Sequence, residues 1–227
     1  VTINGVLATN VTVVNTSTIT ATTPGSSTTG PVSVLVTTAG GTNIANTLFN
    51  YIGQSSTANV TTPANGAGSA LPFTTQPILT FVDSFGFTDT NYNQPVTMTV
   101  SGGDGFATTV GTTTINAVAG VATFSGVGIS GTAGTIYTLT FTSPGLISTT
   151  EDILLSFGSP TQLITSLIAK GSSGFPFIQQ PVIVIQDAFG NTVADSNALV
   201  TMNASGTDGL TTTLGTTTIN AVNGIAT

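Results

Sequence analysis

The sequence predicts an all-β protein made of β-sandwich domains in tandem, and two observations support this prediction. The residues Gly111–Val118 (GTTTINAV) recur unchanged as Gly215–Val222, at an offset of 104 residues. About half of the positions in Leu71–Thr123 are identical at the same offset in Phe175–Thr227, which is a domain-sized repeat. Thr, Ser, Gly, Val, Ala and Asn dominate the composition, and β-branched residues favour extended backbone over helix.

Composition and charge narrow the class of protein further. The chain is 39% hydrophobic and 4% charged, so it can bury cores, which argues against the alternative of a disordered Ser/Thr-rich stalk. The net charge is −7 and Lys170 is the only basic residue, so binding to nucleic acid or to an anionic membrane is not expected. Cys is absent, which excludes disulfides and thiol chemistry. A surface rich in Thr, Ser and Asn predicts an extracellular or cell-surface prokaryotic protein.

The repeat divides the chain into three units. The first unit is expected at 1–52, the second at 53–157 and the third at 158–227, opposite the first part of the second. The second should contain seven short strands separated by Gly-rich turns, a pattern typical of a sandwich. These strands are expected at Ala58–Thr61, Pro77–Val82, Val96–Val100, Thr112–Ala117, Gly120–Phe124, Ile136–Thr142 and Glu151–Phe157.

Both ends of the sequence predict a segment of a longer protein. The chain opens with Val1 and has no basic leader, which is typical of a mature or partial segment. The third unit has no counterpart of the residues from Phe124 to Phe157. We expect these strands to follow Thr227 in the parent chain; the alternative is that a neighbouring molecule supplies them, since an open sheet edge promotes association.

Short strands and tight turns are expected in the first unit, where Asn4-Gly5 is the strongest hairpin signal. This unit resembles the C-terminal two-thirds of an IPT/TIG domain, an immunoglobulin-like fold, and the opening strands of that family are missing. The resemblance rests on five motifs: Ile3–Val6, Ala8-Thr9, Thr18–Pro24, Thr38–Thr42 and the closing Phe49-Asn50-Tyr51.

The second and third units resemble the bacterial Ig-like domains of invasin/intimin-type adhesins. Asp187–Val193 (DAFGNTV) followed by Val200-Thr201 matches the strand–turn–strand element of the family, and Asn223–Thr227 (NGIAT) matches its Gly-Val-Ala-Thr motif. The second unit keeps Asp83 and Gly120–Thr123 but has Phe87 where the family prefers Asn. The resemblance implies tandem immunoglobulin-like β-sandwiches in a passive extracellular rod, without an activity of their own.

No catalytic residue and no cofactor site are predicted, so the chain is not expected to be an enzyme. His and Cys are absent, which excludes Ser-His-Asp and Cys-His constellations and zinc sites. Glu151 and Asp152 are adjacent carboxylates, but neighbours on a strand point to opposite faces and cannot act as a pair. Phe residues at repeat-equivalent positions, such as Phe85 and Phe189, are expected in cores and not as sugar platforms.

Repeat-equivalent aspartates suggest the only metal site that the sequence offers. Asp83 and Asp187 each stand three residues before a Gly, and Ca²⁺ could bind there with Asp104 or Asp208 and backbone carbonyls. The alternative, which we favour, is an Asx-turn in which the carboxylate accepts bonds from nearby N–H groups. Asp104 and Asp208, each followed by Gly, are likewise expected in turns.

These observations predict a structural protein: a stalk, filament or sheath segment of a large prokaryotic surface protein. The alternative is a cell-adhesion module whose loops bind glycans or a receptor, and a third possibility is the accessory domains of an enzyme. The expected partners are neighbouring copies of the chain or adjoining domains, without nucleic acid and without membrane insertion.

Overall fold

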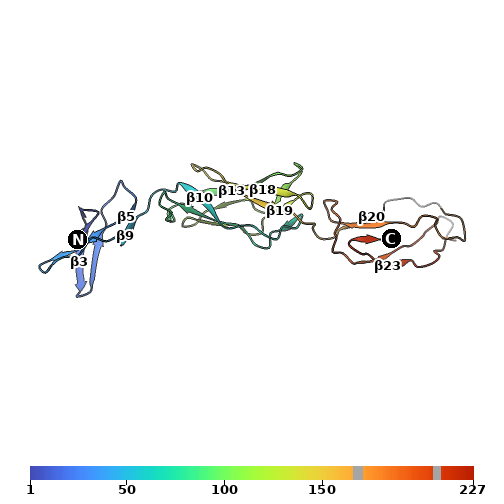
Figure 1. Cartoon of the computed structure of the whole chain (residues 1–227), viewed down its shortest axis with the longest axis horizontal. Helices are drawn as coiled ribbons and strands as arrows, with labels where there is room; N and C mark the ends of the chain where they lie inside the picture. The colour runs from blue at the N-terminus through green and yellow to red at the C-terminus, as the bar shows by residue number, and fades with distance from the viewer. Residues whose placement is uncertain (166–170, 207–210) are drawn as a thin grey trace.

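A computed structural model describes residues 1–165, 171–206 and 211–227 and confirms the all-β class. These residues form antiparallel strands in several small sheets and no helix, and so none that could cross a membrane. Figure 1 shows the three units following one another along the long axis of the molecule, from the N-terminal unit to the unit that contains β20 and β23.

Four small sheets make up the first unit, and almost none of its apolar side chains is buried. The Asn4-Gly5 turn joins the first two strands with φ angles of 53° and 77°, as a tight hairpin requires. Ile3 and Val32 are its buried apolar residues, whereas Val11, Val13 and several others are exposed. Its sheets are β2-β1-β6, β3-β4, β5-β9 and β7-β8. Its strands are β1 (Thr2–Ile3), β2 (Val6–Leu7), β3 (Thr9–Asn15), β4 (Thr18–Thr22), β5 (Gly30–Val32), β6 (Val34–Leu35), β7 (Thr37–Thr38), β8 (Gly41–Thr42) and β9 (Phe49–Tyr51).

The second unit has the largest core of the chain. Its sheets are β10-β12-β16, β15-β13-β18-β19 and β11-β17-β14, and one buried cluster takes side chains from all three. Burial alternates along β18, where Tyr137, Leu139 and Phe141 point inward, as the period of a half-buried strand requires. Its strands are β10 (Thr57–Thr62), β11 (Leu71–Pro72), β12 (Ile78–Val82), β13 (Pro95–Gly102), β14 (Thr108–Val110), β15 (Thr114–Asn116), β16 (Val121–Thr123), β17 (Gly128–Ser130), β18 (Ile136–Thr142) and β19 (Thr149–Leu154).

Strand pairing in the third unit repeats that of the second unit. Ile183 pairs with Ala226 as Leu79 pairs with Ala122, so the offset of 104 residues holds for strand partners as well as for sequence. The core is small: Ile185, Val193, Val200, Ala221 and Ala226 are buried in it. The sheets are β20-β21-β24 and β22-β23. The strands are β20 (Gln162–Thr165), β21 (Ile183–Gln186), β22 (Leu199–Thr201), β23 (Thr218–Asn220) and β24 (Ile225–Ala226).

Several expectations from the sequence differ from the structure. The closing strand expected at Glu151–Phe157 lies earlier in the chain, because β19 covers Thr149–Leu154. The strand expected at Thr112–Ala117 is shorter, because β15 covers Thr114–Asn116 alone. Phe85 and Phe189 were expected in cores but are exposed, since each lies inside the turn that follows a buried Asp.

Candidate functional site

Asp187 organises the junction between the second and third units. It follows β21, and its carboxylate is buried, with 2% of the residue exposed. Oδ1 accepts the N–H groups of Phe189 and Asn191, both at 2.9 Å, which fixes the turn. Oδ2 accepts the N–H of Gly158 at 2.8 Å, and Gly158 is where the chain enters the third unit. One carboxylate therefore holds both a turn and the connection between units.

Asn191 bonds the third unit directly to the second. Its Nδ2 donates to the carbonyl of Gly131 at 3.0 Å and to Asp187 Oδ2 at 2.9 Å. Its Oδ1 accepts the N–H of Ala133 at 2.8 Å. Gly131 and Ala133 lie in the loop between β17 and β18 of the second unit. A single amide side chain thus satisfies a donor and an acceptor of the neighbouring unit.

The connecting segment is anchored on both sides of this junction. Ser156 donates from its N–H and its hydroxyl to the carbonyl of Ala67 in the second unit, each at 2.8 Å. Phe157, which the repeat assigns to the end of the second unit, packs against the core of the third. At Gly158 a Cβ atom would lie 2.1 Å from the carbonyl oxygen of Ser69, so only glycine fits there.

Asp83 makes the equivalent turn at the junction of the first and second units. Its Oδ1 accepts the N–H groups of Phe85 at 2.9 Å and Phe87 at 3.0 Å, and its Oδ2 accepts that of Gly53 at 2.9 Å. Phe87 occupies the position equivalent to Asn191 of the third unit, and it has no side-chain amide that could bond the first unit. Instead the Phe85 ring lies beside Gly30 of the first unit, where a Cβ atom would come within 3.1 Å of the ring. This junction therefore uses an apolar contact where the second uses hydrogen bonds.

The candidate calcium ligands that the structure describes all accept hydrogen bonds from protein groups. The oxygens of Asp83 and Asp187 accept N–H groups, as the Asx-turn interpretation predicts. Asp104 binds Thr132 Oγ1, the Tyr137 hydroxyl at 3.0 Å and the Phe106 N–H at 3.1 Å. In residues 1–165, 171–206 and 211–227, no three acidic side chains gather into a metal-holding group. Asp208 lies outside the described residues.

Hydrogen bonding lowers the pKa of all three aspartates. The Gly53 N–H is the main cause for Asp83, outweighing burial, and the Thr132 hydroxyl is the main cause for Asp104. Burial acts to raise the pKa of Asp187, but the N–H groups of Gly158 and Asn191 outweigh it, so that its pKa is also below the ordinary 3.8. Each carboxylate is thus favoured in its ionised form.

Glu151 and Asp152 lie on opposite faces of β19. Glu151 is partly buried, and both of its oxygens lie 3.2 Å from the N–H of Ala64, whereas Asp152 is exposed and accepts the Thr138 hydroxyl at 2.7 Å. Burial raises the pKa of Glu151, with the Ala64 N–H acting against it. The two carboxyls face different surroundings and do not form a glycosidase pair.

These pKa directions predict how stability depends on pH. The contribution of the three aspartates is present above pH 3.8 and is lost as pH falls through their depressed pKa values. Glu151 acts in the opposite sense: stability rises as pH falls from neutral through its raised pKa toward 4.5. Urea unfolding midpoints should therefore rise slightly on mild acidification and then fall. Glu151→Gln should remove the rise and keep the fall; if it removes neither, the Glu151 assignment is wrong.

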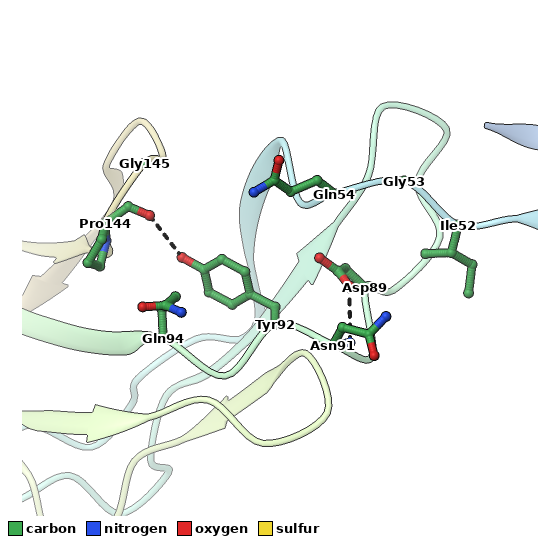
Figure 2. A pocket seen from close by; sticks show the side chains of 9 residues that line it. All are labelled: Ile52, Gly53, Gln54, Asp89, Asn91, Tyr92, Gln94, Pro144 and Gly145. Carbon is green, nitrogen blue, oxygen red and sulfur yellow. Dashed lines mark hydrogen bonds between the residues drawn. The ribbon is translucent and has the colours of Figure 1, made fainter. Parts of the chain in front are cut away.

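A hollow of about 550 Å³ lies at the first junction, between the connecting segment and two loops of the second unit (Figure 2). The Tyr92 ring stacks on Phe81 at 4.3 Å, and its hydroxyl donates to Ser143 Oγ at 2.8 Å. Asp89 is buried and accepts the N–H and the hydroxyl of Ser55, each at 3.0 Å. The hollow is lined by Ile52, Gly53, Gln54, Asp89, Asn91, Tyr92, Gln94, Pro144 and Gly145.

Three side-chain amides in this hollow, those of Gln54, Asn91 and Gln94, are exposed, and within the described parts of the chain they bond no protein atom. Exposed amide donors and acceptors suit a polar ligand such as a sugar, whereas Tyr92 is buried against Phe81. Tyr92, Gln54 and Pro144 come from separate loops, so no local motif marks the hollow. The only sequence signal for the Asn191 contact was that the two DxFG copies differ at the next residue, Phe87 against Asn191.

Comparison with known proteins adds no function to these contacts. No family model matches the chain, and no curated protein shows significant similarity to it. The two family resemblances therefore stay expectations that rest on the motifs quoted above. Function is inferred from the two junctions and the hollow.

Proposed function

We propose that this chain is a structural segment of a large prokaryotic surface protein, a stalk, filament or sheath built from tandem Ig-like domains outside the cell. The observation that carries the proposal is the second junction. There Asn191 bonds Gly131 and Ala133 across the boundary between units, and Asp187 bonds Gly158 in the connecting segment. Direct bonds between consecutive units oppose their reorientation, which is what a spacer needs.

The connecting segment supports the same conclusion. Flexible linkers are rich in Gly and Ser and have no buried anchors. Here Leu155 is buried in the second unit, Phe157 packs on the third, and Ser156 is bonded to Ala67. Bending at this point would expose apolar surface and break hydrogen bonds. The presence of one Lys or Arg in 227 residues also leaves few cleavage sites for trypsin-like proteases, which suits an exposed position.

Replacing Asn191 with alanine should loosen the second junction without unfolding either unit. The variant loses both bonds to the second unit, so the two units should reorient more independently. NMR relaxation would show this as separate tumbling of the second and third units, and small-angle scattering would show a broader distribution of overall lengths.

Asn197→Ala is the matched control, because Asn197 is exposed and its side chain makes no hydrogen bond within the described residues. It should leave both measurements unchanged. If Asn191→Ala behaves like Asn197→Ala, the junction bonds do not fix the angle, and the stalk proposal loses its main support.

A second candidate function is glycan or receptor binding at the first junction. The three exposed amides of the hollow favour it. Screening the chain on a glycan array tests this candidate: a selective hit that weakens in Asn91→Ala but not in Asn59→Ala would place the ligand in the hollow. The absence of any selective hit would argue against this candidate.

A further inference from the structure

We propose that Asp104 is a positioning residue of the second junction: from inside the second unit it holds the loop between β17 and β18 in the shape that Asn191 binds. We call this loop, residues 131–134, the junction loop. Asp104 lies in the turn after β13, and its partners Thr132, Tyr137 and Phe106 belong to the second unit. Because the same junction carries the proposed spacer function, this role of Asp104 rests on that function.

The junction loop has four consecutive backbone N–H groups, and they do not all serve the same unit. Three of them have acceptors inside the second unit: Gly131 donates to Ser69 Oγ at 3.2 Å, Thr132 to the Tyr137 hydroxyl at 3.0 Å and Gly134 to the carbonyl of Leu155 at 2.7 Å. The N–H of Ala133 donates to Asn191 Oδ1 at 2.8 Å, across the junction. The second unit therefore fixes the loop on both sides of the N–H group that serves the third unit.

The acceptor that the junction loop offers to the third unit is also held from within the second. The carbonyl of Gly131 accepts the Ser69 hydroxyl and Asn191 Nδ2, each at 3.0 Å. Ser69 is buried, with 2% of the residue exposed. A Cβ atom at position 131 would lie 2.7 Å from the Tyr137 hydroxyl, so the loop backbone and this side chain are in close contact. The loop thus has a defined shape before Asn191 is considered.

Asp104 bonds the two side chains that hold the middle of the junction loop. Its Oδ2 accepts the Thr132 hydroxyl, and its Oδ1 accepts the Tyr137 hydroxyl at 3.0 Å. Because the Tyr137 oxygen accepts the Thr132 N–H in turn, the three residues form a closed ring of hydrogen bonds. Bonds to an ionised carboxylate are stronger than bonds between neutral groups. Fixing both the side chain and the N–H of Thr132 sets the direction of the next N–H group, that of Ala133.

The turn that contains Asp104 does not by itself explain these bonds. Asp104 Oδ1 also accepts the N–H of Phe106 at 3.1 Å, as an Asx-turn requires. The same turn, however, is closed by a backbone bond from the Gly105 N–H to the carbonyl of Gly102 at 3.2 Å. What the Asp104 side chain adds is the connection from this turn to the junction loop.

Hydrogen exchange and NMR relaxation of the full chain test the proposal. In Asp104→Ala, exchange at the Ala133 N–H should quicken about tenfold, the factor that corresponds to the net value of one hydrogen bond. The second and third units should also tumble more independently. Exchange at Gly134 should stay slow, because the Leu155 carbonyl still accepts its N–H. Combining Asp104→Ala with Asn191→Ala should loosen the junction no further than Asn191→Ala alone, since both act on one contact.

Asp152→Ala is the matched control. Asp152 is an exposed carboxylate of the same unit and also accepts a threonine hydroxyl, that of Thr138 at 2.7 Å, but it lies on β19. Its replacement should leave both measurements unchanged. Thr132→Val keeps the volume of the side chain and removes its hydroxyl, so it should loosen the junction in the same direction as Asp104→Ala. This variant decides the matter if Asp104→Ala unfolds the second unit.

The outcomes separate the positioning role from the spacer function. If Asn191→Ala loosens the junction and neither Asp104→Ala nor Thr132→Val does, the positioning role is wrong and the spacer proposal stands. If none of the three loosens it, the spacer proposal loses its support and the positioning role is wrong with it. An equal effect of Asp152→Ala would assign the change to net charge, and equally quickened exchange at Gly134 would assign it to a general loss of loop structure. Either result would overturn the proposal.

Discussion

Replacing Phe81 with alanine is expected to destabilise the second unit by about 3–5 kcal/mol, a large part of the stability of a domain of this size. Phe81 is fully buried in β12 and stacks on Tyr92 at an interplanar angle of 22°. The substitution leaves a cavity in a core to which all three sheets contribute, and the surrounding strands cannot close it without breaking their pairing. Urea unfolding followed by Tyr fluorescence would measure the change.

Phe106→Ala is the control for this prediction, since Phe106 is 72% exposed in a loop of the same unit. It should change the free energy of unfolding by less than about 0.5 kcal/mol. Equal effects of the two substitutions would mean that the β12 face is not the core of the unit.

Asp187→Ala is expected to destabilise the third unit by about 2–4 kcal/mol and to free it from the second unit. The substitution leaves the N–H groups of Gly158, Phe189 and Asn191 without their acceptor, and burial prevents water from replacing it fully. It also removes one partner of the Asn191 amide. Thermal unfolding should show an earlier transition for the third unit, and scattering should show greater interdomain freedom.

Two further variants distinguish the loss of the Asp187 hydrogen bonds from the loss of a negative charge. Asp195→Ala removes an exposed carboxylate that makes no hydrogen bond among the described residues, so it should have little effect. Asp187→Asn keeps one acceptor oxygen but places an NH₂ group against either the turn or the Gly158 N–H. Its loss of stability should therefore lie between those of Asp195→Ala and Asp187→Ala. A destabilisation by Asp195→Ala as large as that by Asp187→Ala would show that net charge, and not the bonding of Asp187, is responsible.

The pairing of strands in the third unit could be predicted from the repeat, because the same residues at the same spacing are expected to pair in the same way. The partners Leu79–Ala122 and Ile183–Ala226 confirm this in two sheets. The strands β11, β14 and β17 could not be predicted. They have two or three residues each, too few for alternation to be visible, and β17 pairs with both of the others.

Part of the candidate site could also be predicted. The turns at Asp83 and Asp187 follow from local chemistry, since a carboxylate reaches N–H groups two and four residues further on. The bonds of Asn191 to the second unit could not be predicted, because they depend on where another unit places its loop. Phe85 and Phe189 were predicted to lie in cores because they occur at equivalent positions of the repeat. They are exposed in both units, so what the repeat conserves at this position is the turn and not a buried ring.

The partners of Asn191 make the second junction different from the first. They lie in the Gly131–Ala133 loop, which the first unit does not have, and the first junction uses the Phe85 ring and Gly30 instead. Exchanging two units would place each turn opposite a surface built for the other. The two junctions therefore differ in chemistry, and each turn is matched to the surface of the unit that precedes it.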